Sequence, residues 1–167
     1  MPKIVLINPE IPPNTGNIAR SCAATNTPLH LVRPLGFELS DKYLKRAGLD
    51  YWPHVDLHLH ESAEEFWRHA QSEPGQLIGF SARSNRYSTQ CYTDIAYSPD
   101  DWLIFGKESQ GLSADALEQC DLIATIPMPG QHVRSLNLSV SAAVGLFEAI
   151  RQTVRGKALQ TTTSDVT

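Results

Sequence analysis

Cysteine is scarce in this sequence. The chain has three cysteines, Cys22, Cys91 and Cys120, which lie far apart and form neither a C-x-x-C pair nor a cluster with histidine. An odd number at such spacing excludes the disulfide framework of a small secreted domain and suggests no metal cage. We expect all three thiols to be reduced and to have structural roles.

Long apolar runs are absent as well. No stretch approaches the roughly 20 consecutive apolar residues that cross a bilayer. Residues 1–7 lack the basic start, long apolar stretch and cleavage site of a signal peptide, and are instead typical of a first strand. We therefore expect a cytoplasmic protein with no membrane partner.

The chain is short for two domains. Its 167 residues, 41% of them hydrophobic, suffice for one well-buried core. We expect a single domain over residues 1–155. Residues 156–167 are polar and rich in threonine, which is typical of a flexible tail.

Positive charge is in short supply. The net charge of −4 and the pI of about 5.8 argue against a general nucleic-acid binder, because phosphate contacts need lysine and arginine. An RNA partner therefore needs a local basic surface, for which the candidates are Lys42, Lys45, Arg46, Arg83 and Arg86. A solvated helix surface and a polar loop explain the same residues without RNA.

Short apolar runs alternate along the chain with segments of helical periodicity. This alternation predicts an α/β fold, in which a mostly parallel sheet has helices on both faces. The expected strands are residues 4–7, 29–32, 55–59, 77–80, 102–105 and 122–126.

Helix signals are clear in three of the other segments. Residues 18–23 have helical spacing that stops at Asn26, and Ser62 with Glu65 forms a capping box. A long amphipathic helix is expected from about Ser139 to Arg155. Small residues at 141, 142 and 145 permit close approach of a second backbone, so this helix is a candidate dimer interface. Packing against its own sheet is the alternative.

Histidine alternates with apolar residues between positions 54 and 60. A strand there places His54, Asp56, His58 and His60 on one face. A polar, solvent-facing strand surface explains this pattern without a metal. We expect no metal site.

The common nucleotide-binding fingerprints are missing. Neither G-x-G-x-x-G after the first strand nor G-x-x-x-x-G-K-[ST] occurs, so Rossmann and P-loop assignments are unsupported. Instead, three irregular segments each follow an expected strand, and ligands of open α/β sheets collect at the carboxyl ends of strands.

The first irregular segment is a proline-rich loop that leads to a helix start. It delivers Asn14 and Gly16 to the helix, with Arg20 about one turn inside. A helix N-terminus with one arginine suits an RNA phosphate. Alternatively, Asn14 only caps the helix and Arg20 extends over the surface.

The second segment is a tight turn at residues 105–112. Gly106 and Gly111 bracket Lys107 and Glu108, so the main chain can approach a ligand closely while Glu108 is held at the strand end. An ordinary strand-to-helix turn is the alternative.

The third segment, residues 126–139, contains two prolines and a glycine that force an irregular path. Its unpaired main-chain groups need partners, and the edge of an adenine would be one. Asn137 and Ser139 could instead simply cap the following helix. His132 also lies here and is a weak candidate for a substrate contact.

Together, the three segments resemble the three motifs of the SPOUT methyltransferases, and the resemblance covers residues 3–155. The matching motifs are N-T-G-N-I-A-R at 14–20, F-G-K-E-S-Q-G-L at 105–112, and I-P-M at 126–128 with S-L-N-L-S at 135–139. Residues 8–20 and R-A-G-L-D-Y at 46–51 are most similar to the TrmL (YibK-like) subfamily, a minimal SPOUT domain. Its members methylate the 2′-hydroxyl of the wobble ribose, on cytidine or modified uridine, in leucine tRNAs.

The resemblance implies an S-adenosylmethionine-dependent tRNA ribose methyltransferase that is a homodimer. It also implies an α/β knot, a deep C-terminal trefoil knot, although protein chains as a rule avoid knots. The implied cofactor contacts are Phe80, Gly106, Ile126, Met128, Ser135 and Leu136. The implied reactive-end residues are Asn14, Arg20, Glu108 and Asn137.

Arg20 is the base proposed for relatives. Because a guanidinium stays protonated, holding an RNA phosphate and the developing alkoxide is chemically easier for it. Glu108 is the more ordinary proton acceptor, or it orients Arg20.

Three other functions stay open. Lys107 and the Ser109-Gln110 pair depart from the subfamily pattern, which leaves another tRNA position or ribosomal RNA as the target. A non-catalytic RNA-binding protein with the same fold is the second alternative. The third is a flavodoxin-like small-molecule binder, which suits the acidic pI.

Overall fold

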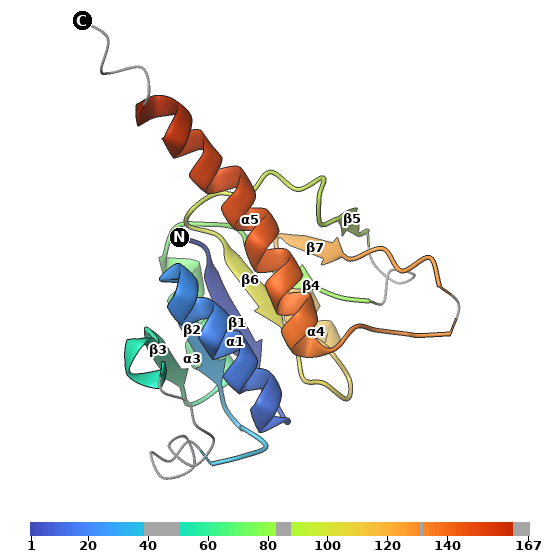
Figure 1. Ribbon diagram of the computed structural model, residues 1–167. Coiled ribbons are helices and arrows are strands. Elements are labelled where there is room, and N and C mark those ends of the chain that lie inside the picture. The colour runs from blue at the N-terminus through green and yellow to red at the C-terminus, as the bar shows by residue number, and fades with distance from the viewer. Residues whose placement is uncertain (39–50, 83–87, 131, 162–167) are drawn as a thin grey trace, which may run out of the picture.

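The computed structural model describes residues 1–38, 51–82, 88–130 and 132–161, with side chains as far as Thr153. In this part of the chain, the central feature is a seven-stranded sheet with the order β3-β2-β1-β6-β4-β7-β5 (Figure 1). Every neighbouring pair is parallel. The strands are β1 (Lys3–Ile7), β2 (Leu29–Val32), β3 (Leu57–His60), β4 (Leu77–Phe80), β5 (Gln90–Cys91), β6 (Trp102–Phe105) and β7 (Leu122–Thr125).

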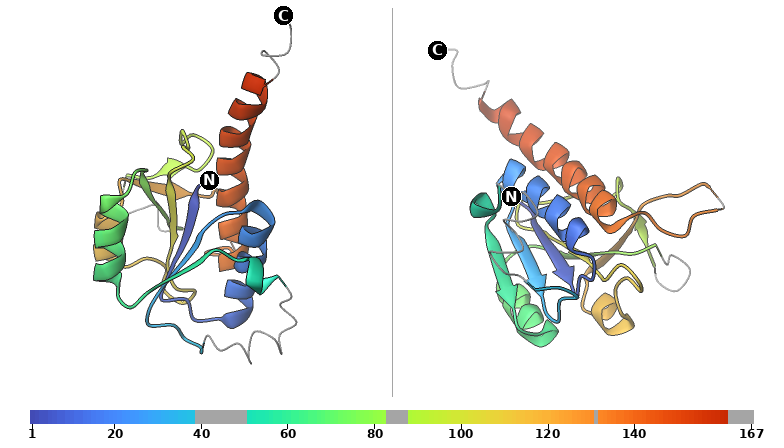
Figure 2. Two further views of the ribbon diagram at one scale, coloured as in Figure 1. Left: turned by 90° about the vertical axis from the view of Figure 1, so that its left-hand side faces the viewer. Right: turned by 60° about the horizontal axis from the view of Figure 1, so that its bottom comes forward.

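Helices cover both faces of this sheet. The longer ones, α1 (Pro12–Thr25) and α5 (Leu138–Thr161), lie on one face, while α3 (Ala63–Ser72) and α4 (Ala114–Glu118) lie on the other (Figure 2). A short 3-10 helix, η1 (Trp52–His54), packs beside α1. The predicted α/β architecture is therefore confirmed.

Two apolar layers hold the helices to the sheet. Because successive strand residues point to opposite faces, Ile4 and Leu6 of β1 join the layer beneath α1 and α5, while Val5 and Ile7 join the layer beneath α3 and α4. All four side chains are buried. A parallel sheet buried on both faces needs such continuous apolar runs, which explains why its strands were recognisable.

The strand predictions were accurate where apolar runs are continuous. β2, β4 and β6 have the predicted bounds, β1 starts at Lys3, and β7 ends at Thr125. β3 is shifted to Leu57–His60, so His54 lies in η1 and not in the strand. β5 was missed because Gln90–Cys91 is neither long nor apolar and forms through its pairing with β7.

Local signals explain the helix ends. α1 begins at Pro12, earlier than predicted, because proline suits the first helical positions, and it ends at Asn26 in the left-handed conformation at φ 50°. Ser62 caps α3 as predicted, accepting a hydrogen bond from the amide of Glu65 at 3.1 Å. The returning bond to the Glu65 carboxylate comes from the amide of Glu61, at 2.8 Å, rather than from Ser62 itself.

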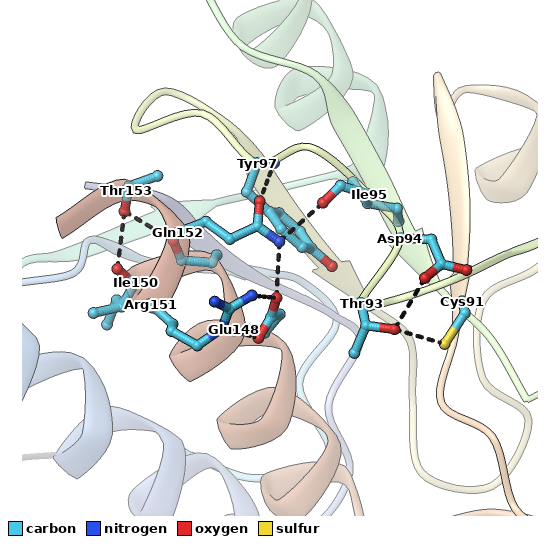
Figure 3. A network of polar contacts seen from close by, with 11 residues as sticks. Cys91, Thr93, Asp94, Ile95, Tyr97, Glu148, Ile150, Arg151, Gln152 and Thr153 are labelled. Carbon is cyan, nitrogen blue, oxygen red and sulfur yellow. Dashed lines mark hydrogen bonds and ion pairs between the residues drawn. The ribbon is translucent and has the colours of Figure 1, made fainter. Parts of the chain in front are cut away.

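Helix α5 is tied to the segment between β5 and β6 by Gln152 (Figure 3). The side-chain amide donates to the Ile95 carbonyl at 3.0 Å and accepts from the Tyr97 amide at 3.1 Å. α5 continues to Thr161, beyond the predicted end at Arg155, so part of the predicted tail 156–167 is helical. Residues 162–167 lie outside the described part of the chain.

The cysteines and the helices can be compared with the predictions of no disulfide framework and no membrane span. All three cysteines lie among the described residues and are free. Burial raises the pKa of the Cys22 and Cys120 thiols to about 12, so both stay protonated near neutral pH. None of the helices in the described ranges is both long enough and apolar enough to span a bilayer.

Candidate functional site

A cavity of about 820 Å³ opens at the carboxyl ends of β4, β6 and β7. This is the edge of an open α/β sheet where ligands collect, and the volume is in the range of small-molecule sites. All six residues expected to contact a cofactor line it, namely Phe80, Gly106, Ile126, Met128, Ser135 and Leu136. The structure thus brings these residues together, and their role as cofactor ligands stays a prediction.

Two phenylalanines form an apolar part of the cavity wall. The rings of Phe80 and Phe105 stack with centroids 4.7 Å apart. Phe80 also packs against Gly145 of α5, where an added Cβ would lie 2.6 Å from the ring Cζ. A glycine at this helix position therefore makes room for Phe80.

The small residues of α5 consequently face inward. Gly145 and Ala142 are buried in this chain, and Ser141 lines the cavity. Packing within the chain, the alternative, therefore holds for Ala142 and Gly145, and the use of α5 as a dimer interface stays a prediction.

The second irregular segment forms a compact turn along the cavity. The amide of Gly111 donates to the carbonyl of Lys107 at 2.7 Å, and Gly111 has a φ of 70°. A Cβ on Gly106 would lie 2.1 Å from the carbonyl carbon of Gly111. Both positions therefore need glycine, Gly106 for the close approach and Gly111 for its backbone conformation.

Glu108 ties this turn to the loop before α1. Its carboxylate accepts hydrogen bonds from the amide of Glu10 at 2.7 Å, the amide of Ile11 at 3.2 Å and the side-chain amide of Asn14 at 3.0 Å. Ile11, the N-cap of α1, offers no side-chain cap of its own. A carboxylate near a helix N-terminus is electrostatically favourable. Glu108, although it belongs to another segment, therefore acts as the cap of α1.

Asn14 and Asn137 complete the connection between the three segments. The side-chain amide nitrogen of Asn137 donates to the side-chain oxygen of Asn14 at 2.9 Å. The side-chain oxygen of Asn137 accepts a hydrogen bond from the main-chain amide of Ser139 at 2.8 Å. Asn14 lies inside the first turn of α1, so the alternative that it only caps the helix was wrong. Asn137 does cap α5, as the alternative held, while Ser139 does not.

Arg20 lies apart from this connected group. Its side chain is exposed, and its guanidinium carbon lies 4.8 Å from the centre of the Tyr51 ring. The Tyr51 hydroxyl donates to the Gly16 carbonyl at 2.7 Å and so anchors the ring to α1. Arg20 therefore contacts Tyr51, while the hydrogen bonds of the Glu108 carboxylate run to Glu10, Ile11 and Asn14.

The other candidate RNA contacts fall outside the described residues. These are Lys42, Lys45, Arg46, Arg83 and Arg86. The structure therefore gives no position for them.

Several cavity residues were not predicted. Ser81, Arg134 and Ser141 line the cavity beside the expected residues. Signals existed for two of them, since Ser81 directly follows the strand end at Phe80 and Ser141 lies one helical turn after Asn137. Arg134 directly precedes the matched motif at 135–139 and supplies a positive charge at the cavity.

The histidine prediction needs correction. His60 is buried, and its Nε2 lies 2.9 Å from Nδ1 of His30, which is 1% exposed. The His30 ring also stacks on His58, with centroids 4.4 Å apart, and contacts Trp102. The polar strand surface is thus partly enclosed beneath α3, because His60 and His30 pack with aromatic neighbours instead of facing water.

The two buried histidines of this cluster, His30 and His60, have lowered pKa values. Burial, reinforced by His58, His60, His69 and Lys3, lowers the pKa of His30 to about 3. Burial also lowers the pKa of His60, with a smaller opposing effect of Glu65. Among the described residues, no group of three or more metal-ligating side chains is arranged to hold a metal ion.

Relatives with established or provisional names match almost the whole chain. A Synechocystis protein provisionally named tRNA (cytidine(34)-2′-O)-methyltransferase is 57% identical over 91% of this chain and 97% of its own length. A Burkholderia ambifaria protein with the name tRNA (cytidine(34)-2′-O)-methyltransferase is 44% identical over 89% of this chain and 94% of its own.

Solved structures agree with these relatives. One, described as giving insight into 2-OH methylation of C/U34 on tRNA, superposes with a TM-score of 0.80 at 48% identity, covering 91% of this chain and 95% of the other. The SpoU methyltransferase AviRb from Streptomyces viridochromogenes, in complex with AdoMet, has a TM-score of 0.75 at 26% identity, covering 91% of this chain and 57% of AviRb.

The family assignment rests on most of the chain. Residues 1–147 match the SpoU rRNA Methylase family, a range that includes the turn at Glu108, Asn14 and Asn137. The chain therefore belongs to the SpoU methylase family.

Proposed function

We propose that this protein transfers a methyl group from S-adenosylmethionine to the 2′-hydroxyl of the ribose at position 34, the wobble position, of tRNA. The observation that carries this proposal is the hydrogen-bonded chain from Glu108 through Asn14 to Asn137, which joins all three motif segments at one cavity. The names of the relatives and the family membership supply the reaction and the target.

The cavity suits the cofactor. Its stacked Phe80 and Phe105 rings and the side chain of Met128 offer apolar surface to a purine, while Ser135 and Arg134 offer polar and charged groups to the amino-acid part. S-adenosylmethionine supplies an electrophilic methyl group on a positively charged sulfur. After the transfer it leaves as neutral S-adenosylhomocysteine, and the proton of the ribose hydroxyl is released to solvent. AviRb, another SpoU methyltransferase, holds this cofactor.

The two asparagines fix the reactive end. A ribose hydroxyl is a poor nucleophile, so it must be held in line with the methyl group and lose its proton. One amide hydrogen of Asn137 is used by Asn14, and we assign its second one to an oxygen of the ribose. Asn14 holds Asn137 in that orientation and is itself held by Glu108.

Glu108 has a positioning role in this scheme. Its two oxygens already accept three hydrogen bonds, and taking a proton would weaken all of them. Arg20, which stays charged and lies outside the cavity lining, is assigned to an RNA phosphate.

We assign contacts with tRNA to Arg20 and to five basic residues outside the described part of the chain, namely Lys42, Lys45, Arg46, Arg83 and Arg86. A chain with a net charge of −4 can bind RNA only through a local group of positive side chains, and these residues are the basic candidates in the sequence. Leucine tRNAs are the substrates that the subfamily resemblance indicates, and the cytoplasm is the compartment in which such a tRNA would be modified.

A homodimer is part of the proposal. On α5, Val140 is 47% exposed and Phe147 is 53% exposed, and they lie on one side of the helix because they are two turns apart. Large apolar side chains gathered in this way mark association surfaces. We assign this side of α5 to the contact with a second copy.

A deep C-terminal trefoil knot is the remaining part of the proposal. β7 follows β5 in sequence yet lies between β4 and β5 in the sheet, and the chain then returns to α5 on the face that α1 covers. This order is compatible with a chain threaded through an earlier loop.

A substrate lacking one oxygen tests the proposed reaction. Wild-type protein should methylate a leucine tRNA in the presence of S-adenosylmethionine, and the same tRNA with a 2′-deoxynucleotide at position 34 should accept no methyl group. Equal methylation of both tRNAs would place the reaction elsewhere. RNA binding without methyl transfer to any tRNA or ribosomal RNA would favour a non-catalytic RNA-binding protein.

A further inference from the structure

We infer that Glu10 is a positioning residue for cofactor binding. Its carboxylate is hydrogen-bonded to Ser109, an arrangement we call the clasp, and so holds the cavity turn at residues 106–111 in place. This inference rests on the proposed function. Glu10 itself does not line the cavity, whereas every residue of the turn from Gly106 to Gly111 does.

The clasp is reciprocal. The Glu10 carboxylate accepts two hydrogen bonds from Ser109, one from the amide at 2.9 Å and one from the hydroxyl at 3.0 Å. In return, the Glu108 carboxylate accepts the amide of Glu10 at 2.7 Å. Each segment thus places a carboxylate on a main-chain amide of the other, across about 100 positions of sequence.

The two halves of the clasp hold different things. Glu108 binds main-chain amides and Asn14, and those bonds do not need the Glu10 side chain. The Glu10 carboxylate instead holds the turn at Ser109. Loss of the Glu10 side chain should therefore loosen the turn while Asn14 and Asn137 stay connected.

Charge is arranged to keep Glu10 ionised beside Glu108. The hydrogen bonds from Ser109, and then the positive charge of Lys107, lower the pKa of Glu10. The clasp should therefore persist throughout the neutral range in which tRNA is methylated.

The main chain at Glu10 also contacts the loop that follows β2. The amide of Gly36 donates to the carbonyl of Pro9 at 2.9 Å, and a Cβ on Gly36 would lie 2.8 Å from the Glu10 Cα. The loop after β2 therefore packs directly on the Glu10 main chain. Ser109 is held by a rigid support, which is what a positioning residue needs.

The test uses S-adenosylmethionine binding, measured by calorimetry on the full chain. Glu10→Ala should raise the Kd about tenfold, the lower end of what charge-assisted hydrogen bonds contribute, because the pair is exposed. Ser109→Ala, which keeps the main-chain bond, should raise it about threefold. Glu10→Gln, which keeps one acceptor, should fall between wild type and Glu10→Ala.

A double variant separates positioning from general damage. Glu10→Ala combined with Ser109→Ala should bind no more weakly than Glu10→Ala alone, because both remove the same contact. Glu73→Ala, which removes an exposed carboxylate at the end of α3, is the matched control and should bind like wild type. The inference would be overturned if the increases in Kd of the two single variants multiplied in the double variant, or if Glu10→Ala bound with wild-type affinity.

Amide hydrogen exchange without cofactor gives a second readout. Peptides covering residues 106–111 should exchange faster in Glu10→Ala than in wild type, and peptides of β1 and β6 should not change. Unchanged exchange in the turn would contradict the clasp. Failure of wild-type protein to bind S-adenosylmethionine would contradict the proposed function, and with it the role assigned to Glu10.

Discussion

The side-chain amide of Asn137 lies 2.9 Å from the side-chain carbonyl oxygen of Asn14, although the two residues are 123 positions apart in sequence. Asn137 uses its own carbonyl oxygen to cap α5, so one side chain both starts a helix and joins two motif segments. A change at this position therefore has two separable effects, one on stability and one on the reactive end.

Asn137→Ser should separate them. Serine is also a good N-cap and keeps an oxygen for the Ser139 amide, so the free energy of unfolding should fall by only about 1 kcal/mol, from the lost bond to Asn14. Loss of the amide donor should lower kcat about 100-fold, as is typical when a donor to a reacting oxygen is removed. Thermal unfolding and single-turnover methylation would measure the two effects, with Asn137→Ala as the variant expected to lose both.

Tyr51 provides a test of the role of Arg20. Tyr51→Leu removes the ring beneath the guanidinium and should lower kcat/KM for tRNA about tenfold, while the Kd for S-adenosylmethionine stays the same. Tyr51→Phe keeps the ring and loses only the bond to the Gly16 carbonyl, so its effect should be smaller. Equal loss in both variants would mean that the hydroxyl, and not the ring, matters.

Gly145→Ala should disturb the cavity wall from behind. The new methyl group would meet the Phe80 ring, and overpacking of this kind costs about 1–3 kcal/mol, partly offset by the better helix propensity of alanine. Cofactor affinity should fall as Phe80 shifts. Phe80→Leu in the same protein should recover stability, and Gly130→Ala, which meets nothing within 4 Å, is the control. A stable Gly145→Ala with normal affinity would contradict the packing.

The histidine cluster predicts acid sensitivity. The pKa of His30 is about 3 in the folded protein against 6.5 as its ordinary value, so the unfolded chain binds the proton more readily. The contribution of neutral His30 to the free energy of unfolding is therefore fully present above pH 6.5 and is lost as the pH falls toward 3. At pH 5 the loss from His30 alone should be about 2 kcal/mol. Denaturant unfolding at pH 7.5 and pH 5 measures this loss.

His30→Gln is the matched variant for that measurement. Glutamine does not titrate and can still bond to His60, so the difference in stability between the two pH values should shrink by about 2 kcal/mol. His132→Gln removes an exposed histidine outside the cluster and should behave like wild type. An unchanged pH dependence in His30→Gln would remove His30 as its source.

The fold was largely predictable because burial on both faces leaves a strong mark on sequence. The continuous apolar run of Trp102–Phe105 admits little besides a central strand, and all four residues are buried. Gln90–Cys91 has no such run, and its strand depends on β7, which is distant in sequence. The early start of α1 had a signal in Pro12 and Pro13 that helical periodicity alone did not use.

The site was predictable only as a set of segments. Positions after strand ends led to the cavity residues, because carboxyl ends of parallel strands meet at one edge. The pairing of Glu108 with Asn14, the clasp of Glu10 on Ser109 and the enclosure of His30 each join residues far apart in sequence. Periodicity describes only local neighbours, so these contacts required the three-dimensional arrangement.

The central claim is tested most directly by methyl transfer from labelled S-adenosylmethionine to total tRNA, followed by mapping of the labelled nucleotide. The predicted result is label on the ribose 2′-oxygen of position 34, lost in Asn137→Ser and kept in Glu73→Ala. Label at another position would keep the reaction and contradict the target, and wild-type protein that binds no S-adenosylmethionine and transfers no label would contradict the proposed enzyme.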